Sequence, residues 1–132
     1  KTCFSTVFAK ELIKTGQEIW FINTASMLLI IQDSFDNDKV SALDIISEYS
    51  HKPHLVLDDM GSEKTTEYAR QALYVIINNR YENNLPIIVT SNIVNLSEFA
   101  NKIDDRIVSR LLEMCKIIMM TDNYRIERRQ SQ

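Results

Sequence analysis

Glycine, proline and cysteine are scarce in this sequence, and each occurs only twice among its 132 residues. Gly16 follows an expected helix, where a left-handed cap residue is favoured, and Gly61 follows two adjacent acids. Both glycines therefore have local tasks, and none remains to build a glycine-rich phosphate-binding loop. We expect any such loop to lie upstream of Lys1.

Long apolar runs and metal-binding cysteine patterns are also lacking. The longest aliphatic stretches, such as residues 27–31, are far too short to span a membrane, and no charged-then-apolar leader is present. Cys3 and Cys115 do not have the spacing of a zinc site, and two cysteines fit a reducing compartment. His51 and His54 have no third ligand nearby, which disfavours a metal pair. We expect a cytoplasmic protein without a membrane partner.

Basic charge is scarce over most of the chain. Residues 1–101 contain 8 Lys and Arg against 13 Asp and Glu, whereas residues 102–132 contain 7 against 5. The acidic majority argues against a protein that coats duplex DNA, because such binding requires many phosphate contacts. The basic end could contact phosphate locally, or it could be a solvated tail.

The residues that are present indicate one folded α/β domain. Hydrophobic residues make up 45% and charged residues 25%, which is an ordinary globular mixture. Periodic apolar positions predict an alternation of strands and helices, and hence a mainly parallel sheet. Strands are expected at Glu18–Asn23, Leu55–Leu57, Ile87–Ser91 and Ile117–Met120. Helices are expected at Phe4–Leu12, Thr24–Ile31, Ser41–Tyr49, residues 65–77, Leu96–Asn101 and from Asp104 onward.

Several residues are assigned to helix ends and inner faces. Polar side chains just before apolar periodic stretches favour helix caps, which we expect at Thr24, Thr65 and Asp104. In the helix over residues 41–49, we expect the apolar side chains to turn inward; these are Leu43, Ile46 and Tyr49.

The apolar run Leu55–Leu57 ends in two adjacent carboxylates, Asp58 and Asp59. Such a run suits a strand buried on both faces of a parallel sheet, and open α/β sheets bind ligands beyond the strand tips. Taken alone, an acid pair in this place is more often a simple strand exit. Lys1 and Thr2, however, match the end of a Gly-Lys-Thr phosphate loop. Because one helix–strand–helix passage separates the two motifs, together they indicate a nucleotidase cut within its phosphate loop.

Each motif would have a task with ATP and Mg²⁺ in this crevice. Asp58 would hold Mg²⁺ together with the Thr2 hydroxyl, since hard oxygen ligands suit this ion. Asp59 would polarise the attacking water, and Lys1 would neutralise charge on the β- and γ-phosphates. A polar side chain within Thr90–Asn92, at the end of the next strand, could orient the γ-phosphate or the water.

Arg106 and Arg110 are four residues apart and therefore share one face of the expected Asp104 helix. They could be surface arginines that pair with Asp105 or Glu113. Alternatively, one of them could be an arginine finger that enters a neighbouring subunit's ATP site. The second interpretation requires a ring or filament of protomers.

Four segments in this order resemble the DnaC/DnaI helicase loaders, which share their ATPase core with the IstB transposition proteins within the AAA+ ATPases. The segments are residues 55–67 (LVLDDMGSEKTTE), 76–81 (IINNRY), 85–92 (LPIIVTSN) and 106–111 (RIVSRL). The resemblance implies a five-stranded sheet whose central Walker A strand and phosphate loop are missing from this chain. It also implies binding of ATP and Mg²⁺, of single-stranded DNA and, for loaders, of a replicative helicase through a separate N-terminal segment.

The resemblance also suggests individual roles. The acid pair would be the Walker B motif, Asn92 would be sensor 1, Arg110 the preferred arginine finger and Arg106 the neighbouring box VII arginine. Whether Arg125 senses nucleotide stays open. We therefore expect residues 1–132 to be a single AAA+ domain, cut within Walker A and inactive alone. The complete protein would be an oligomeric ATPase and a helicase loader of the primosome.

The sequence leaves two alternative functions open. The first is an IstB-type transposition ATPase, whose core motifs are nearly the same. The second belongs to another class: a non-hydrolysing remnant of the fold that binds DNA or a protein partner.

Overall fold

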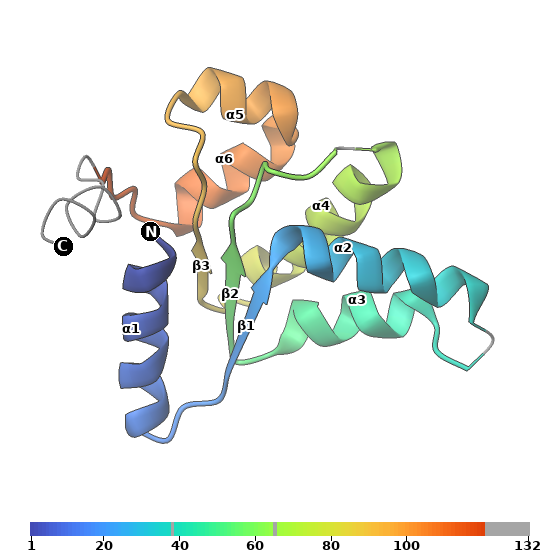
Figure 1. The fold of residues 1–132 in the computed structure, drawn as a ribbon, viewed down its shortest axis with the longest axis horizontal. Helices are drawn as coiled ribbons and strands as arrows, with labels where there is room; N and C mark the ends of the chain where they lie inside the picture. The colour runs from blue at the N-terminus through green and yellow to red at the C-terminus, as the bar shows by residue number, and fades with distance from the viewer. Residues whose placement is uncertain (38, 65, 121–132) are drawn as a thin grey trace, which may run out of the picture.

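Helices and strands alternate along the chain in the computed structural model, which describes residues 1–37, 39–64 and 66–120 (Figure 1). The strands are β1 (Ile19–Asn23), β2 (His54–Asp58) and β3 (Ile87–Val89). The helices are α1 (Thr2–Lys14), α2 (Thr24–Asp33), α3 (Ala42–His51), α4 (Glu67–Glu82), α5 (Leu96–Lys102) and α6 (Asp105–Met114), with a short 3₁₀ turn, η1 (Ser34–Asp36), after α2. None of the helices in these ranges is both long and apolar enough to cross a lipid bilayer.

The three strands form one parallel sheet in the order β1-β2-β3. In the register of this sheet, Asn23 lies opposite Asp58, and Leu57 lies opposite Val89. Because the strands run in the same direction, their carboxyl ends meet at one edge, which we call the carboxyl edge. The N-terminus of the chain lies at the same end of the molecule (Figure 1). The expected α/β class with a parallel sheet is confirmed.

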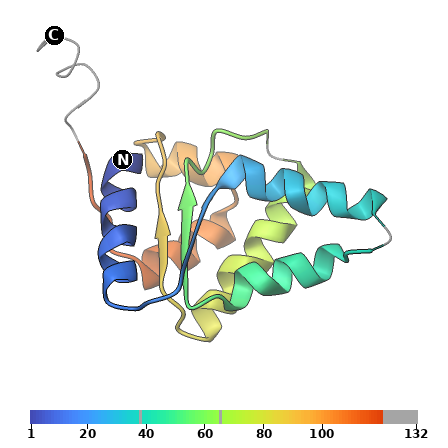
Figure 2. The ribbon, with the colours of Figure 1, turned by 60° about the horizontal axis from the view of Figure 1, so that its bottom comes forward.

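The sheet lies between α1 on one side and α2, α3 and α4 on the other (Figure 2). The middle strand is the most buried, and Leu55–Leu57 are at most 1% exposed. The α4 face that covers it is also fully enclosed and includes Leu73, Ile76 and Ile77. Burial of each such side chain contributes about 1.5–3 kcal/mol, and these residues of α4 belong with Leu55 and Leu57 to one buried cluster.

Helix α1 contacts the sheet through small residues. Its buried residues are Ser5 and Ala9, whereas Phe4, Val7 and Phe8 are about half exposed. The apolar periodicity therefore predicted the helix correctly, but these larger side chains do not form its buried face.

The predicted cap of α2 is wrong by one residue. Asn23 is the cap, and its side-chain oxygen accepts a hydrogen bond from the N–H of Ser26 at 3.2 Å. Thr24 is the first helical residue instead, and its buried hydroxyl donates to the carbonyl oxygen of Asp58 at 3.0 Å. The Thr24 hydroxyl thus joins α2 to β2 rather than capping its own helix.

The other two caps have different outcomes. Thr66 caps α4 by accepting from the N–H of Ala69 at 3.1 Å, while the predicted cap, Thr65, lies outside the described residues. The predicted Asp104 cap of α6 is confirmed, since its carboxylate accepts from the N–H of Arg106 at 2.8 Å.

Two expectations about apolar residues are wrong. Leu43 of α3 is 75% exposed, although Ile46 and Tyr49 are buried as predicted. Residues Ile117–Met120 do not form a strand. A strand requires a neighbour to pair with its N–H and C=O groups, and these residues pair with none of the described strands. The described part of the implied five-stranded sheet therefore consists of three strands.

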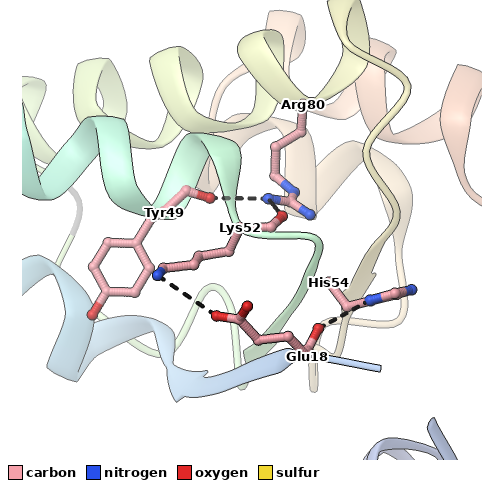
Figure 3. A network of polar contacts seen from close by, with 5 residues as sticks. All are labelled: Glu18, Tyr49, Lys52, His54 and Arg80. Carbon is pink, nitrogen blue, oxygen red and sulfur yellow. Dashed lines mark hydrogen bonds and ion pairs between the residues drawn. The ribbon is translucent and has the colours of Figure 1, made fainter. Parts of the chain in front are cut away.

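Hydrogen bonds and an ion pair link the segments at the amino ends of the strands, opposite the carboxyl edge (Figure 3). Arg80 of α4 is fully buried and donates to the carbonyl oxygens of Tyr49 and Lys52 at 3.0 and 2.8 Å. The Lys52 ammonium lies 3.7 Å from the Glu18 carboxylate. The ring of His54 donates from Nδ1 to the Glu18 carbonyl oxygen at 3.0 Å. The segments that enter β1 and β2 are thereby joined to each other and to α4.

Candidate nucleotide site

The acid pair lies at the carboxyl edge of the sheet. Asp58 ends β2 and is 7% exposed, because the neighbouring strands flank it. Asp59 has a left-handed backbone with φ of 58°, which turns the chain sharply out of the strand. Aspartate tolerates this conformation better than most residues. The two carboxylates therefore lie in different surroundings, one inside the sheet edge and one at the opening.

Two hydroxyls hold the Asp58 carboxylate. Thr2 Oγ1 donates to Oδ2 at 3.0 Å, and Thr90 Oγ1 donates to Oδ1 at 2.7 Å. A threonine hydroxyl beside an aspartate carboxylate is the kind of hard oxygen pair that binds Mg²⁺, which keeps several waters and takes phosphate oxygens as well. The described residues contain no group of three or more His, Cys, Asp or Glu side chains that could hold a metal ion. The oxygen atoms of Thr2 and Asp58 fit a Mg²⁺ ion whose remaining ligands are water and phosphate oxygens.

Asn92 and Lys1 complete the cluster around Asp59. The side-chain amide of Asn92 donates from Nδ2 to Asp59 Oδ1 at 2.8 Å. The Lys1 ammonium lies 3.5 Å from Asn92 Oδ1. The structure thus brings together the predicted residues Lys1, Thr2, Asp58, Asp59 and Asn92, although they come from three separate parts of the sequence.

An open depression adjoins Asp59 and Asn92, whereas Lys1, Thr2 and Asp58 are not among the residues that line it. Asp59 and residues 92–95 line one part of it, and Glu98 and Lys102 of α5 line another. Its position beyond the strand tips is where open α/β sheets bind ligands. Asp59 and Asn92 are the residues of the cluster that border this depression.

The loop after the acid pair is fixed against the loop after β3. The hydroxyl of Ser91 donates to the Met60 carbonyl oxygen at 2.7 Å, and the N–H of Gly61 donates to the buried Glu63 carboxylate at 3.0 Å. Gly61 has a positive φ of 92°, and a Cβ there would lie 2.7 Å from the Ile93 side chain. Any other residue here would strain the backbone and displace the Ile93 side chain, so glycine is favoured at this position.

Arg106 lies outside the cluster, on the face that α4 and α6 form together. Its guanidinium donates from Nε and Nη2 to the Asp104 carboxylate at 3.1 and 3.0 Å, and it lies 4.6 Å from the centre of the Tyr74 ring. These hydrogen bonds hold the pKa of Asp104 below its usual range. The carboxylate partner of Arg106 is thus Asp104, not the predicted Asp105 or Glu113.

Arg110 lies on the same face. It donates from Nε to Asn78 Oδ1 at 3.2 Å, and its guanidinium lies 4.4 Å from the centre of the Tyr81 ring. Its Nη1 is 3.9 Å from the Glu113 carboxylate, which is one of the two pairings that the surface alternative offered. The structure does not bring Arg106 and Arg110 into contact with the acid pair of their own chain.

The sequence predicts neither the contact of Thr90 with the acid pair nor the contact of Thr24 with Asp58. In the sequence Thr90 belongs to a polar strand end, whereas in the structure its hydroxyl contacts the Asp58 carboxylate and the Asp59 N–H. Threonine is common at strand ends, so its contact with a neighbouring strand cannot be predicted from the sequence alone. Arg125, whose role the sequence left open, lies outside the described residues.

Comparisons with known proteins give both a family and relatives. A family model described as IstB-like ATP binding protein matches residues 1–132. The replicative helicase loader DnaC of Escherichia coli (strain K12) is 22% identical over 127 residues, which cover 95% of this chain and 51% of DnaC. DnaC of Shigella flexneri matches with the same identity and coverage. The chain thus spans about half the length of these curated relatives.

Two solved structures share the fold. The crystal structure of the DnaC helicase loader superposes with a TM-score of 0.71 and 25% identity, over 83% of this chain and 65% of that chain. The crystal structure of a DNA replication initiation factor superposes with a TM-score of 0.74 over 92% of this chain and 38% of that chain. At 18% identity, the second likeness shows the fold alone.

Proposed function

The chain belongs to the IstB-like ATP-binding protein family, and we propose that it forms the ATPase domain of a replicative helicase loader. Its fold is that of the DnaC- and IstB-like AAA+ domains. One observation carries the ATPase proposal: Thr2, Asp58, Asp59 and Asn92 form a connected cluster at the carboxyl edge of the sheet. The DnaC relatives support the loader role.

The residues of this cluster divide into binding and catalytic roles. Bound ATP with Mg²⁺ would supply a γ-phosphoryl group, whose transfer to water releases ADP and phosphate. Thr2 and Asp58 present the oxygen atoms that would hold Mg²⁺, either directly or through water. Lys1, at the same edge, would neutralise negative charge on the β- and γ-phosphates. We propose that these three side chains fix the phosphates in place together with a glycine-rich loop before Lys1.

Asp59 would orient and polarise the attacking water. Asn92 occupies Asp59 Oδ1 by a hydrogen bond at 2.8 Å, which leaves Oδ2 for water. Because aspartate is one methylene shorter than glutamate, Asp59 would act through a second water. Asn92 would hold the Asp59 carboxylate in this orientation. Asp58 would then bind Mg²⁺ while Asp59, next to it, would bind the water.

The proposal extends to partners and assembly. DnaC is a replicative helicase loader by name, and we propose a replicative helicase and single-stranded DNA as partners of the complete protein in the cytoplasm. We also propose an active homo-oligomer in which Arg110 of one protomer, or else Arg106, enters the site of its neighbour. Both arginines lie on a face away from the acid pair of their own chain, which suits action on another subunit.

A transposition ATPase is the second candidate, because the matching family model is the IstB-like one. The two candidates share the chemistry of the site and differ in the partner. Stimulation of ATP hydrolysis by a replicative helicase would favour the loader, whereas stimulation by a transposase would favour the second candidate.

Asp59→Asn in the full-length protein tests the proposed chemistry. Steady-state ATP hydrolysis should fall by about 10²–10⁴-fold, the range for loss of a general base, while the Kd for ATP stays within a few fold. The exposed Asp44→Asn on α3 is the matched control and should hydrolyse ATP like the parent. Equal hydrolysis by Asp59→Asn and the parent would remove Asp59 from the mechanism. An inactive parent would favour the non-hydrolysing remnant instead.

A further inference from the structure

Thr90 directs all of its polar groups at the acid segment. Its hydroxyl donates to Asp58 Oδ1 at 2.7 Å and accepts from the N–H of Asp59 at 2.9 Å. Its own N–H donates to the Leu57 carbonyl oxygen at 3.0 Å, and its carbonyl oxygen accepts from the N–H of Met60 at 2.8 Å. These four hydrogen bonds contact four consecutive residues of the acid segment, so each polar group of Thr90 has a partner in that segment.

The two hydroxyl contacts determine different properties of the acids. The bond to Oδ1 fixes the rotation of the Asp58 carboxylate, so that Oδ2 faces the Thr2 hydroxyl. The bond from the Asp59 N–H holds a residue whose φ of 58° is rare for a side-chain-bearing residue. That left-handed turn is what sends the Asp59 side chain toward Asn92. A single hydroxyl therefore contacts the carboxylate of one acid and the backbone of the other.

We infer that Thr90 is a positioning residue for the acid pair, which couples the Mg²⁺-facing oxygen of Asp58 to the direction of the Asp59 carboxylate. This inference rests on the proposed ATPase function and adds to it a residue whose hydroxyl contacts the two acids. Thr90 acts through Asp58 and Asp59. Its loss is expected to change the metal requirement and the turnover rate more than the binding of ATP.

Thr90→Val in the full-length protein removes the hydroxyl and keeps the shape of the side chain. The kcat for ATP hydrolysis should fall by about 10–100-fold, the usual effect of removing a group that orients a metal ligand. The Mg²⁺ concentration for half-maximal rate should rise by a similar factor, while the KM for ATP at saturating Mg²⁺ stays within a few fold. Thr90→Ser keeps the hydroxyl and should return all three values close to those of the parent.

A measurement without nucleotide checks the geometry itself. Amide hydrogen exchange at Asp59 should be about tenfold faster in Thr90→Val, because the N–H loses its acceptor, and should return to the parental rate in Thr90→Ser. Ser50→Ala removes a buried hydroxyl that donates to the Ile46 carbonyl oxygen, far from the acid pair. It is the control for hydroxyl loss, and it should leave hydrolysis and Asp59 exchange unchanged.

The outcomes separate this inference from the function on which it rests. If the parent hydrolyses ATP and Thr90→Val matches it in kcat and Mg²⁺ requirement, Thr90 has no positioning role. Loss of activity that Thr90→Ser fails to restore would also overturn the inference, because the methyl group rather than the hydroxyl would then matter. If Thr90→Val does not fold, Thr90→Ala replaces it in the same comparison. A parent without ATPase activity would overturn the proposed function, and the catalytic part of this inference with it.

Discussion

Arg80 shows how one side chain can organise the end of the sheet that lies opposite the site. Its guanidinium donates to five carbonyl oxygens, and the three shortest of these hydrogen bonds reach Tyr49, Lys52 and Pro86 at 3.0, 2.8 and 2.6 Å. Burial lowers the pKa of Arg80 to about 10, so it stays protonated at neutral pH. No carboxylate pairs with it among the described residues. The charge is thus stabilised by carbonyl dipoles from the segments that enter β2 and β3.

Arg80→Lys should destabilise the domain by about 2–3 kcal/mol, since one ammonium cannot replace a planar fork of donors to several carbonyls. Urea denaturation followed by circular dichroism would measure this loss. Arg70→Lys, on the same helix but incompletely buried, is the matched control and should change stability by about 0.5 kcal/mol or less. Equal losses of unfolding free energy for the two substitutions would show that the carbonyl contacts of Arg80 do not stabilise the domain.

Individual residues of the site could be predicted only where a motif marked them. Asp58, Asp59 and Asn92 follow apolar runs that predict adjacent strands, so their proximity could be inferred. Thr90 and Arg80 depend instead on contacts about 30 residues away along the chain. No local pattern distinguishes a strand-end threonine or a helical arginine with such contacts from a solvent-exposed one.

Helix α6 depends on the residue at its start. Asp104 accepts hydrogen bonds from both the N–H and the side chain of Arg106, so one carboxylate caps the helix and holds the arginine. Arg106 in turn lies over the Tyr74 ring of α4. The cap therefore fixes the packing of α6 against α4 as well as the helix end.

Asp104→Ala should cost about 1–2 kcal/mol of stability through loss of the cap. Asp104→Asn keeps a capping oxygen and loses only the charge pair with Arg106, so its cost should be smaller. Denaturant titration of both variants would give the two values. A cost for Asp104→Asn as large as that for Asp104→Ala would mean that charge, not capping, dominates.

The pH dependence of this pair has a definite sign. The pKa of Asp104 is lower in the folded state than its usual 3.8, mainly because the Arg106 side chain donates to it. The pair therefore stabilises the fold above that value, and this stabilisation is lost as the pH falls through the folded-state pKa. The stability difference between the parent and Asp104→Asn should be constant near neutral pH and shrink below about pH 4. A difference that grows with acidity would contradict this.

The elements were predictable to the extent that local periodicity determines them. The alternation of helices and strands, the buried strand β2 and the α6 cap are confirmed because each depends on neighbouring residues. The cap of α2 was wrong because Asn23 and Thr24 are adjacent and equally suitable, and only the contact with β2 decides between them. The strand at 117–120 was wrong because strand formation depends on a pairing partner that sequence apolarity does not reveal.

At the scale of the whole molecule, the acid pair and the two arginines occupy different faces. The acid pair lies at the carboxyl edge of the sheet, and the arginines lie on the face formed by α4 and α6. One chain therefore presents a candidate site and, elsewhere, a candidate finger for the site of another chain. Such a separation favours catalysis between protomers over catalysis within one.

Arg110→Ala in the full-length protein should leave ATP binding intact and lower hydrolysis by orders of magnitude, as arginine fingers contribute about 10³–10⁵ in rate. Mixing it with Asp59→Asn should restore some activity, because an Arg110→Ala protomer keeps an intact site and can receive a finger from its neighbour. Hydrolysis measured alone and in mixtures, under conditions where the parent oligomerises on single-stranded DNA, gives the comparison.

Lys10→Ala, an exposed change on α1, is the control and should behave like the parent. Parental hydrolysis by Arg110→Ala in the assembled state would defeat the finger assignment. Arg106 would then be the arginine to test in the same way.

The most direct test of the central claim is a crystal structure of the full-length protein with Mg²⁺ and a non-hydrolysable ATP analogue. We expect Mg²⁺ about 2.0–2.1 Å from Thr2 Oγ1, with the Asp58 carboxylate bound directly or through one water. The terminal phosphate should face Asp59 and Asn92 across the open depression. A nucleotide bound elsewhere, or a metal ion that contacts neither Thr2 nor Asp58, would contradict the assignment of the carboxyl edge as the ATP site.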